Sequence, residues 1–435
     1  MGRYMPGSLD NIQNDRKLQS IGIINALRRG TVPADGLERL AVGIATEERV
    51  ITGQLGYVAA GRSDLKFVRG DFGSGKTFLI CRALEIARAE GFVTAHVVIS
   101  PDTPLHKLAA LYRGIAQNLR TGTGEAALKS IIDTWIFRIE ERLIESIGEE
   151  DEEKLAAAAS EEIERSLLRI SSENSGLAAA VRAYYQANNR GDFATAQAAI
   201  GWISGEETVG RSFKSAAGLR GAVDEGSALQ FLRGLTRIIV QAGYRGLAIA
   251  FDEAETTQGS SRPLREKGYV NLRRIIDSVD RNEMPHSFLL FTGTPSFFEG
   301  PKGIRSLPPL YDRLQMPPED GFTNPLQAQI ILSQFDEKRL FEVASRVVEI
   351  YGEAYSEVDP ERVSLRFIRA MIDRITLRFG GRIDVIPRIF LREFVDILDK
   401  CALHASYDPM EKYRFEGAGI PELKEEERAV MEVEW

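Results

Sequence analysis

The hydrophobic pattern of the chain contains four short apolar runs, which predict β-strands. They cover residues 65–69, 92–100, 246–255 and 286–298. The last two are continuous runs of the kind found in central strands covered on both faces, one ending in acids and the other in threonines. Between the first two runs lies a helical pattern from about Lys76 to Glu90, which stops at Gly91. A strand, a helix and a strand in this order favour a parallel βαβ unit.

Helical periodicity dominates the rest of the chain. Residues 20–62 contain two helical stretches around a loop with Thr31, Val32 and Pro33. In residues 121–235 apolar side chains recur at helical spacing, beginning with Ile132, Ile136, Ile139, Leu143 and Ile147. After about Asn324 the pattern is again helical as far as Cys401. We therefore expect a helical insertion within an α/β core and a helical lid after it.

Length and composition indicate a globular protein. The chain has 435 residues, of which 43% are hydrophobic and 27% charged, and its longest apolar runs are far shorter than a bilayer span. The N-terminal residues lack the apolar core of a signal peptide. We expect a cytoplasmic protein with no membrane segment, in which Cys81 and Cys401 remain thiols without a functional role.

Charge distinguishes one segment from the rest of the chain. The whole chain carries a net charge of −8, which argues against a surface coated in nucleic acid. Residues 362–392, in contrast, contain eight arginines, no lysine and two aspartates, which gives +6. Arg366, Arg369 and Arg378 lie largely off the apolar face of the helix predicted there, so that they could bind phosphate oxygens of ATP or DNA. A solvated arginine face is the alternative interpretation.

One glycine-rich stretch, between a predicted strand and a predicted helix, fits the pattern G-x-x-x-x-G-K-[ST]. It consists of Gly70, Asp71, Phe72, Gly73, Ser74, Gly75, Lys76 and Thr77, followed by Phe78. Glycines let successive amides point into one concavity, and the following helix N-terminus adds positive potential for β- and γ-phosphates. Lys76 would contact these phosphates and Thr77 would bind Mg²⁺ through its hydroxyl. A glycine turn with a chance lysine is the alternative.

The paired acids Asp252 and Glu253 end the third apolar run. Asp252 is predicted to support the metal, directly or through its water shell, and Glu253 to polarise an attacking water. A pair of this kind is typical of an ATPase that hydrolyses, whereas a nucleoside kinase would need an acceptor-substrate site that the sequence does not indicate. Acids that merely close a buried strand are the alternative.

Polar residues after the fourth apolar run are candidates for sensing the nucleotide. In ATPases with an additional strand between the two motif strands, a polar residue at its tip senses the γ-phosphate. Thr292 is the first choice here and Thr294 the second, although a threonine turn is the alternative. Arg313 lies further on, where an arginine finger of a neighbouring subunit is often found, but a surface salt bridge would also explain it.

The basic segment is divided by two glycines, Gly380 and Gly381, and Pro387 restarts a helix. This position places Arg388 at the start of the new helix. An arginine at the start of a lid helix can contact ATP from the side opposite to the phosphate loop. Arg388 is the candidate for this role and Arg382 the reserve.

With these motifs in order, the chain resembles the AAA+ ATPases related to archaeal and eukaryotic origin-recognition initiators. It is more similar to one branch, the bacterial P-loop ATP-binding proteins of phage-exclusion (BREX) defence islands. The stretches that carry this resemblance are ALRRGTVPADGLERLAVG, FVRGDFGSGKTFL, ISPDTPLH, GYRGLAIAFDEAE, FTGTPSFFEG and IPRIFLREFVDILD. The resemblance spans about residues 20–415.

The resemblance implies an AAA+ P-loop NTPase fold, α/β with a three-layer parallel sheet, and a division into six segments. These are N-terminal helices with an adenine-side loop (1–62), the first part of the core (63–120), a helical insertion (121–235), the second part of the core (236–324), a helical lid (325–405) and a C-terminal tail (406–435). It also implies that Val32 and Pro33 lie against the adenine base.

The implied function is ATP binding with Mg²⁺ and ATP hydrolysis, in the restriction of phage DNA together with other defence-island proteins. Double-stranded DNA and further copies of the chain are additional candidate partners. Two alternatives stay open. One is a nucleotide-gated scaffold with negligible turnover that recruits nuclease, methylase or helicase partners, and the other is an oligomer that remodels proteins without DNA.

Overall fold

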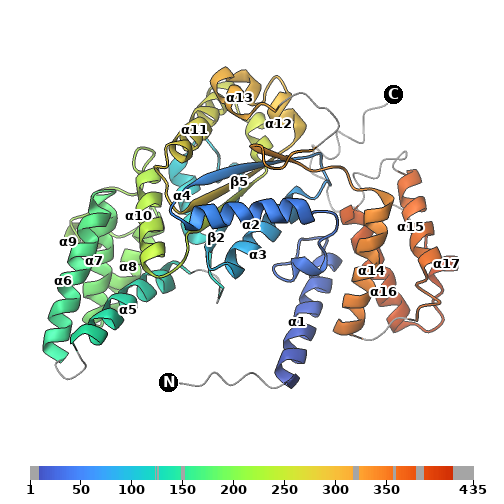
Figure 1. Ribbon diagram of the computed structural model, residues 1–435, viewed down its shortest axis with the longest axis horizontal. Coiled ribbons are helices and arrows are strands. Elements are labelled where there is room, and N and C mark those ends of the chain that lie inside the picture. The colour runs from blue at the N-terminus through green and yellow to red at the C-terminus, as the bar shows by residue number, and fades with distance from the viewer. Residues whose placement is uncertain are drawn as a thin grey trace. The chain divides into compact units, whose positions relative to one another are not determined.

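The computed structural model describes residues 9–122, 124, 127–147, 152–316, 323–355, 359–378 and 387–414, and it shows an α/β protein (Figure 1). The chain divides into two compact units. We call Met1–Glu48, Arg69–Glu85 and Ile331–Trp435 the helical unit, and Arg49–Val68 and Ile86–Ile330 the sheet unit. Each unit is built from segments that are far apart in the sequence.

The sheet unit is organised around six strands. They are β1 (Asp64–Arg69), β2 (Val93–Val98), β3 (Leu119–Arg120), β4 (Leu247–Asp252), β5 (Ser287–Gly293) and β6 (Gln329–Ile331), in the order β3-β2-β4-β5-β1-β6. Strands β2, β4 and β5 are parallel, with Val98 opposite Asp252 in the register of β2 and β4. The order confirms that the threonine strand β5 lies between β4 and β1.

Two expectations about the sheet were wrong. The sheet is mixed and not purely parallel, because the edge strand β3 pairs antiparallel with β2. The region after Asn324 is not helical throughout, since it contains β6. Strands of two and three residues are too short to produce a period-two pattern, which is why the sequence did not indicate them.

The central strands are hydrophobic on both faces because both faces are covered. Every residue of β4 and of β5 is buried, as the continuous apolar runs predict. The ring of Phe291 in β5 stacks on Phe251 in β4 and on Phe67 in β1, with centroid separations of 4.7 and 5.1 Å. Aromatic side chains therefore tie the three strands that precede the candidate site residues.

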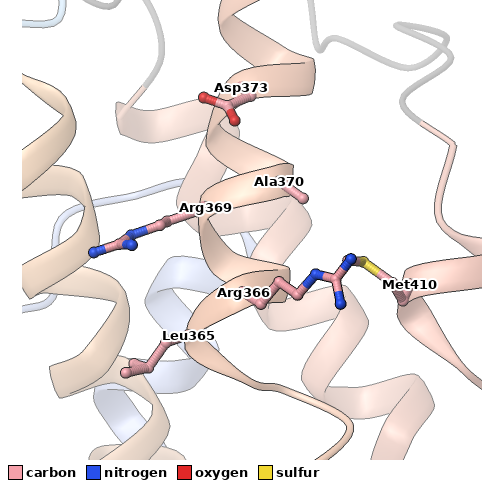
Figure 2. Close-up of a pocket in the computed structure, with 6 residues that line it drawn as sticks. All are labelled: Leu365, Arg366, Arg369, Ala370, Asp373 and Met410. Atoms are coloured by element: carbon pink, nitrogen blue, oxygen red, sulfur yellow. The ribbon is translucent and has the colours of Figure 1, made fainter.

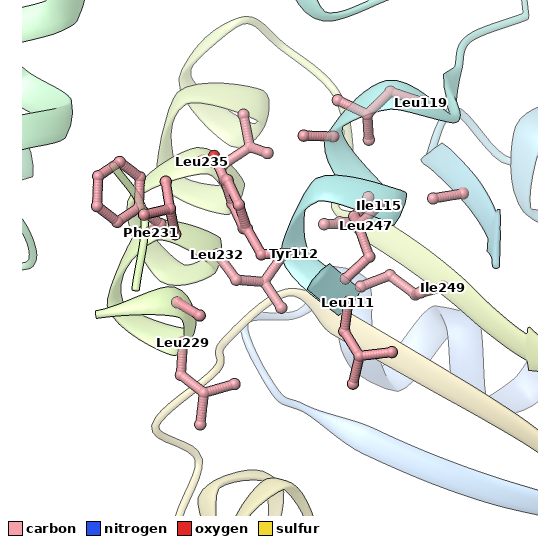
Figure 3. Packing of buried hydrophobic residues seen from close by; sticks show 14 of the residues in the cluster. Leu111, Tyr112, Ile115, Leu119, Leu229, Phe231, Leu232, Leu235, Leu247 and Ile249 are labelled. Atoms are coloured by element: carbon pink, nitrogen blue, oxygen red, sulfur yellow. The ribbon is translucent and has the colours of Figure 1, made fainter. Parts of the chain in front are cut away.

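Ten helices and two short turns lie wholly within the described part of the sheet unit (Figure 1). They are α4 (Leu108–Gln117), α5 (Leu128–Ile147), α6 (Glu152–Ser171), α7 (Ser175–Asn189), α8 (Phe193–Ile203), α9 (Arg211–Ala216), α10 (Ala228–Gln241), α11 (Arg262–Asp280), α12 (Pro295–Glu299) and α13 (Pro308–Leu314), with the 3-10 turns η2 (Ala254–Gly259) and η3 (Ile304–Ser306). Leu111 of α4 and Leu232 of α10 pack near Ile249 of β4 (Figure 3). The helices that follow β2 are thus joined to the sheet by a continuous apolar core.

The predicted helical face within residues 121–235 is confirmed on α5. Ile132, Ile136 and Ile139 are buried there, as their spacing predicts. The indole nitrogen of Trp135 donates a hydrogen bond to the side-chain oxygen of Gln241 on α10, at 2.8 Å. Helix α5 is therefore held to α10 by both apolar and polar contacts.

The helical unit joins the N-terminal helix to the C-terminal helices. Its elements are α1 (Leu9–Arg28), the turn η1 (Leu37–Arg39), α14 (Glu337–Ala354), α15 (Leu365–Arg378), α16 (Pro387–Leu403) and α17 (Pro409–Lys412). Helix α1 packs against α14 and α16 (Figure 1), and the shared core includes Ile24, Leu340 and Phe394. Helices α2 (Ala45–Ala59) and α3 (Lys76–Ala89) each contribute residues to both units.

An ion cluster on α14 predicts that this packing is pH-dependent. Glu353 accepts from Arg16 at 2.7 Å, from Arg39 at 2.6 Å and from Ser20 at 2.9 Å. The hydrogen bond from Arg16 is the main cause that lowers the pKa of Glu353 to about 2. A depressed carboxyl pKa stabilises the fold above the unfolded-state pKa of about 4.5, and this stabilisation is lost as the pH falls towards 2.

We expect Glu353→Gln to lower the free energy of unfolding at pH 7 by about 1 kcal/mol, because these ion pairs are partly exposed. The difference from wild type should shrink as the pH falls from 4.5 to 2. Denaturant unfolding at several pH values measures it. Glu349→Gln, an exposed carboxyl on the same helix, is the matched control and should change little. A difference that is independent of pH would contradict this account.

Among the described residues, no helix is both long enough and apolar enough to cross a membrane.

Candidate functional site

The glycine-rich loop joins β1 to α3 and adopts a backbone that its glycines allow. Gly73 and Gly75 have φ angles of 80° and 91°, a region that other residues rarely adopt. A Cβ atom on Gly70 would lie only 2.3 Å from the hydroxyl oxygen of Ser74. The curled loop therefore depends on all three glycines of the stretch.

Lys76 begins α3 and folds back over this loop. Its ammonium group donates to the carbonyl oxygens of Gly70 and Asp71, at 2.9 and 3.0 Å, and lies 5.2 Å from the ring centroid of Phe72. The side chain is 8% exposed, so that its charge is held within the loop. The buried hydroxyl of Ser74 has no hydrogen-bond partner in the described structure. A positive charge, a buried unpaired hydroxyl and a glycine cradle suit a phosphate group.

The loop with Val32 and Pro33 is attached to the same helix α3. The carboxylate of Glu85 accepts hydrogen bonds from the backbone amides of Gly36 at 2.7 Å and Leu37 at 3.1 Å. Gly36 has a φ of 76°, and a Cβ atom there would meet Gln19 and Ile23 at 2.9 Å. These hydrogen bonds fix the loop with Val32 and Pro33 to α3, the helix that follows the glycine-rich loop. Glu85 is a residue that the sequence did not single out.

The lid candidate Arg388 reaches the beginning of that loop. Its guanidinium Nε donates to the carbonyl oxygen of Gly30, one residue before Thr31. The side chains of Arg388 and Arg392 both lie within 4 Å of the Cβ position of Gly30. The structure thus brings Arg388 to the loop predicted to hold adenine, while contact with ATP stays a prediction. Arg382 lies outside the described residues.

The acid pair lies at the end of β4, where it forms a hydrogen-bonded group with Thr292. Asp252 is 3% exposed and Thr292 is fully buried. The hydroxyl of Thr292 donates to Oδ1 of Asp252 at 2.5 Å, and it accepts from the backbone amide of Glu253 at 2.8 Å. Thr292 therefore positions both acids, and a direct contact with the γ-phosphate stays a prediction.

Glu253 has an unusual backbone conformation. Its φ of 60° and ψ of 42° place it in the left-handed region, which costs of order 1–3 kcal/mol for a residue other than glycine. The hydrogen bonds from its amide to Thr292 and to Asp252, the latter at 3.0 Å, hold it there. Strained residues of this kind cluster at functional sites, which agrees with the role predicted for Glu253.

His96 is a neighbour of this group that the sequence did not indicate. It lies on β2, and its Nε2 is 3.7 Å from Oδ2 of Asp252. The pairing of Ala250 with His96 in the parallel register brings the imidazole to the acid strand. Only knowledge of which strands are neighbours could have predicted this contact.

Thr294 and Arg313 both have partners within the sheet unit. The Thr294 hydroxyl lies 3.0 Å from that of Ser296. Arg313 of α13 forms an ion pair with Asp277 of α11 at 2.8 Å, and its side chain is about one-third exposed. The salt-bridge alternative for Arg313 is thus present in the structure, and the arginine-finger role stays a prediction.

Four of the eight arginines of the basic segment bond to other groups of the helical unit. Their acceptors are the carbonyls of Cys401, His404 and Tyr407 for Arg362, that of Tyr413 for Arg374, that of Gly30 for Arg388, and the carboxylate of Glu393 for Arg392. The side chain of Arg378 is outside the described part. The arginines in the described part of the segment therefore do not form one basic face.

Arg366 and Arg369 differ from these four, although the guanidinium of Arg369 lies 5.5 Å from the ring centroid of Phe341. Both are exposed, and in the part of the chain that the structure describes neither has a hydrogen-bond acceptor. They line a surface pocket of about 480 Å³ together with Leu365, Ala370, Asp373 and Met410 (Figure 2). Their guanidinium groups point to opposite sides of α15. Among the described arginines of the segment, these two are therefore the ones whose guanidinium groups have no protein acceptor and face solvent.

The part of the chain that the structure describes contains no metal site made only of protein ligands. Among the described residues, no three of His, Cys, Asp and Glu gather closely enough to hold an ion. The Thr77 hydroxyl and the Asp252 carboxylate are oxygen donors of the kind that Mg²⁺ takes together with phosphate oxygens and water. Thr77 belongs to the helical unit and Asp252 to the sheet unit, so that their sharing of one ion stays a prediction.

An α/β sheet whose strand β1 leads into a curled glycine loop with an inward lysine is the arrangement of P-loop nucleotide-binding proteins. The family model for the BREX system ATP-binding proteins BrxC/D matches residues 16–417. The chain belongs to this family, so that ATP binding and a part in BREX defence follow from its membership. Comparison with curated proteins gave no match, and neither did comparison with solved structures.

Proposed function

We propose that the protein is an AAA+-type ATPase of a BREX system, in which ATP is bound by the phosphate loop and hydrolysed. Lys76 binds the phosphates, Thr77 and Asp252 hold Mg²⁺, and Glu253 withdraws a proton from the attacking water. The metal neutralises charge on the phosphates when it is bound. The loop at Val32 and Pro33 lies against adenine, and Arg388 responds to the nucleotide from the lid helix.

The observation that carries hydrolysis is the group of Asp252, Thr292 and Glu253. A strained backbone at Glu253 is kept by hydrogen bonds from its own amide, at 2.8 and 3.0 Å, so that its side chain leaves the strand end in a defined direction. A carboxylate that only closes a buried strand has no need of such strain. The arrangement suits a positioned general base.

We propose further that the helical unit converts nucleotide binding into movement. It contains the phosphate loop, the loop with Val32 and Pro33, and the helices α14, α15 and α16 in one compact body. Contacts to ATP that differ from those to ADP would shift these helices between two arrangements, since only differential contacts can change an equilibrium. Other BREX proteins would bind one arrangement better than the other.

The test of the proposed function is ATP turnover of the purified protein, measured with and without duplex DNA, together with its mass in solution. Turnover that requires Mg²⁺ supports the ATPase. Tight ATP binding without turnover, alone or with DNA, would favour the nucleotide-gated scaffold. A rate and a mobility that DNA leaves unchanged would favour an oligomer that acts on proteins.

If duplex DNA is bound, Arg366 and Arg369 are the residues in the described part of the basic segment that we propose to contact its phosphates. The double variant Arg366→Gln/Arg369→Gln is expected to reduce the salt dependence of DNA binding by about 2 in the slope of log K against log salt. Fluorescence anisotropy over a salt series measures this slope. Arg165→Gln/Arg262→Gln, two exposed arginines elsewhere, is the matched control. An unaltered slope would exclude this face as the DNA contact.

A further inference from the structure

Residues 332–335 run alongside the phosphate loop. The backbone amide of Leu332 donates to the carbonyl oxygen of Arg69, the last residue of β1, at 2.8 Å. The Cβ of Leu332 would be 3.4 Å from a Cβ atom on Gly70. This short segment, which the sequence did not indicate as functional, therefore follows the loop from its first residue.

Gln334 continues this contact with a side-chain hydrogen bond. Its amide nitrogen donates to Oδ2 of Asp71 at 3.2 Å. Asp71 is an acidic residue within the loop that we propose to bind phosphate. Its main-chain oxygen accepts a hydrogen bond from Lys76. A carboxylate that is free to turn towards a triphosphate would repel it, so that its orientation matters for binding.

Phe335 and Asp336 connect the same segment to the helices. The ring of Phe335 would be 3.9 Å from a Cβ atom on Gly75, and it packs on the apolar core of the helical unit. The Asp336 carboxylate caps α14 by accepting from the amide of Arg339 at 2.7 Å. The residues that border the phosphate loop are therefore directly continuous with the start of α14.

We propose that Gln334 is a positioning residue for nucleoside triphosphates. It holds the Asp71 carboxylate away from the β- and γ-phosphates, while Phe335 fixes the segment between Gly75 and the helices. This inference rests on the proposed function, because it takes the phosphate loop as the ATP site. Gln334 lies outside the glycine-rich loop, and its loss would expose the triphosphate to the negative charge of Asp71.

The test is a double-mutant cycle read by isothermal titration with ATP and Mg²⁺. Gln334→Ala is expected to weaken ATP binding by about tenfold, because the Asp71 carboxylate is then free to approach and repel the phosphates. Asp71→Asn should bind ATP at least as well as wild type, and Asp71→Asn/Gln334→Ala should return to that affinity. AMP, which lacks the two outer phosphates, should bind Gln334→Ala and wild type equally. Gln327→Ala, an exposed glutamine of the preceding stretch, is the matched control.

The outcomes separate this inference from the proposed function. If the wild-type protein and Gln334→Ala bind ATP equally well, the inference is overturned and the proposed function is not. A loss in Gln334→Ala that Asp71→Asn does not restore, or that is as large for AMP, also overturns it, since the effect is then one of local structure. If the wild-type protein binds ATP tightly and Lys76→Ala binds it with the same affinity, the placement of ATP is overturned and the inference with it.

Discussion

Glu253→Gln is expected to bind ATP as wild type does and to lose its turnover by roughly a hundredfold or more, the size of a general-base contribution. The amide is nearly isosteric with the carboxylate but cannot take a proton from water. The backbone N–H of residue 253 would keep its hydrogen bonds to Thr292 and Asp252, so that the end of β4 stays in place. Phosphate release and ATP binding, measured on the same preparation, show the separation of the two effects.

The matched control for this variant is Glu266→Gln on α11, which is exposed and forms only a surface ion pair with Arg262. It should turn over ATP at the wild-type rate. Equal turnover in Glu253→Gln would remove Glu253 from the chemistry. Equal defence in cells by a Glu253→Gln protein that does not hydrolyse ATP would favour the nucleotide-gated scaffold over the ATPase.

Lys76→Ala is expected to raise the dissociation constant of ATP by roughly 10- to 150-fold, because hydrogen bonds to a charged group contribute about 1.5–3 kcal/mol. The wild-type ammonium is held at the loop by the carbonyls of Gly70 and Asp71. Lys76 therefore needs no large movement to contact a phosphate group bound in this loop. Titration with ATP and Mg²⁺ measures the loss.

Lys338→Ala, an exposed lysine in the first turn of α14, controls for the removal of one positive charge from the same unit. Because Lys76 also braces the loop, the unfolding transition of each variant should be recorded beside its affinity. A Lys76→Ala protein that unfolds as wild type does and binds ATP with unchanged affinity would contradict the assignment of the loop.

The candidate site was predictable from sequence in its parts more than in its connections. The run from Gly70 to Thr77 showed its strand, turn and helix because each depends on consecutive residues. Thr292 was predicted to face the nucleotide, and the structure shows that its hydroxyl bonds to Asp252, 40 positions away. A pattern can place a threonine at a strand tip, but the neighbouring strand decides which groups it meets.

The arginines of residues 362–392 show the same limit. Their number and sign are properties of the sequence and suggested a basic face. Their contacts depend on how α16 and the following turn return to α15, which directs Arg362 to the carbonyls of Cys401, His404 and Tyr407. Composition gives the number of charged residues, but it does not show which of them already form hydrogen bonds or ion pairs within the protein.

The sequence by itself determined the central strands, the phosphate loop, the helical character of residues 121–235 and the acid pair, because periodicity and turn chemistry act between residues close along the chain. Only the tertiary structure decided that α1 packs with α14 and α16, that His96 lies beside Asp252, and that Gln334 reaches Asp71 across 263 positions. Contacts between distant segments depend on the path of the whole chain, and no local pattern encodes that path.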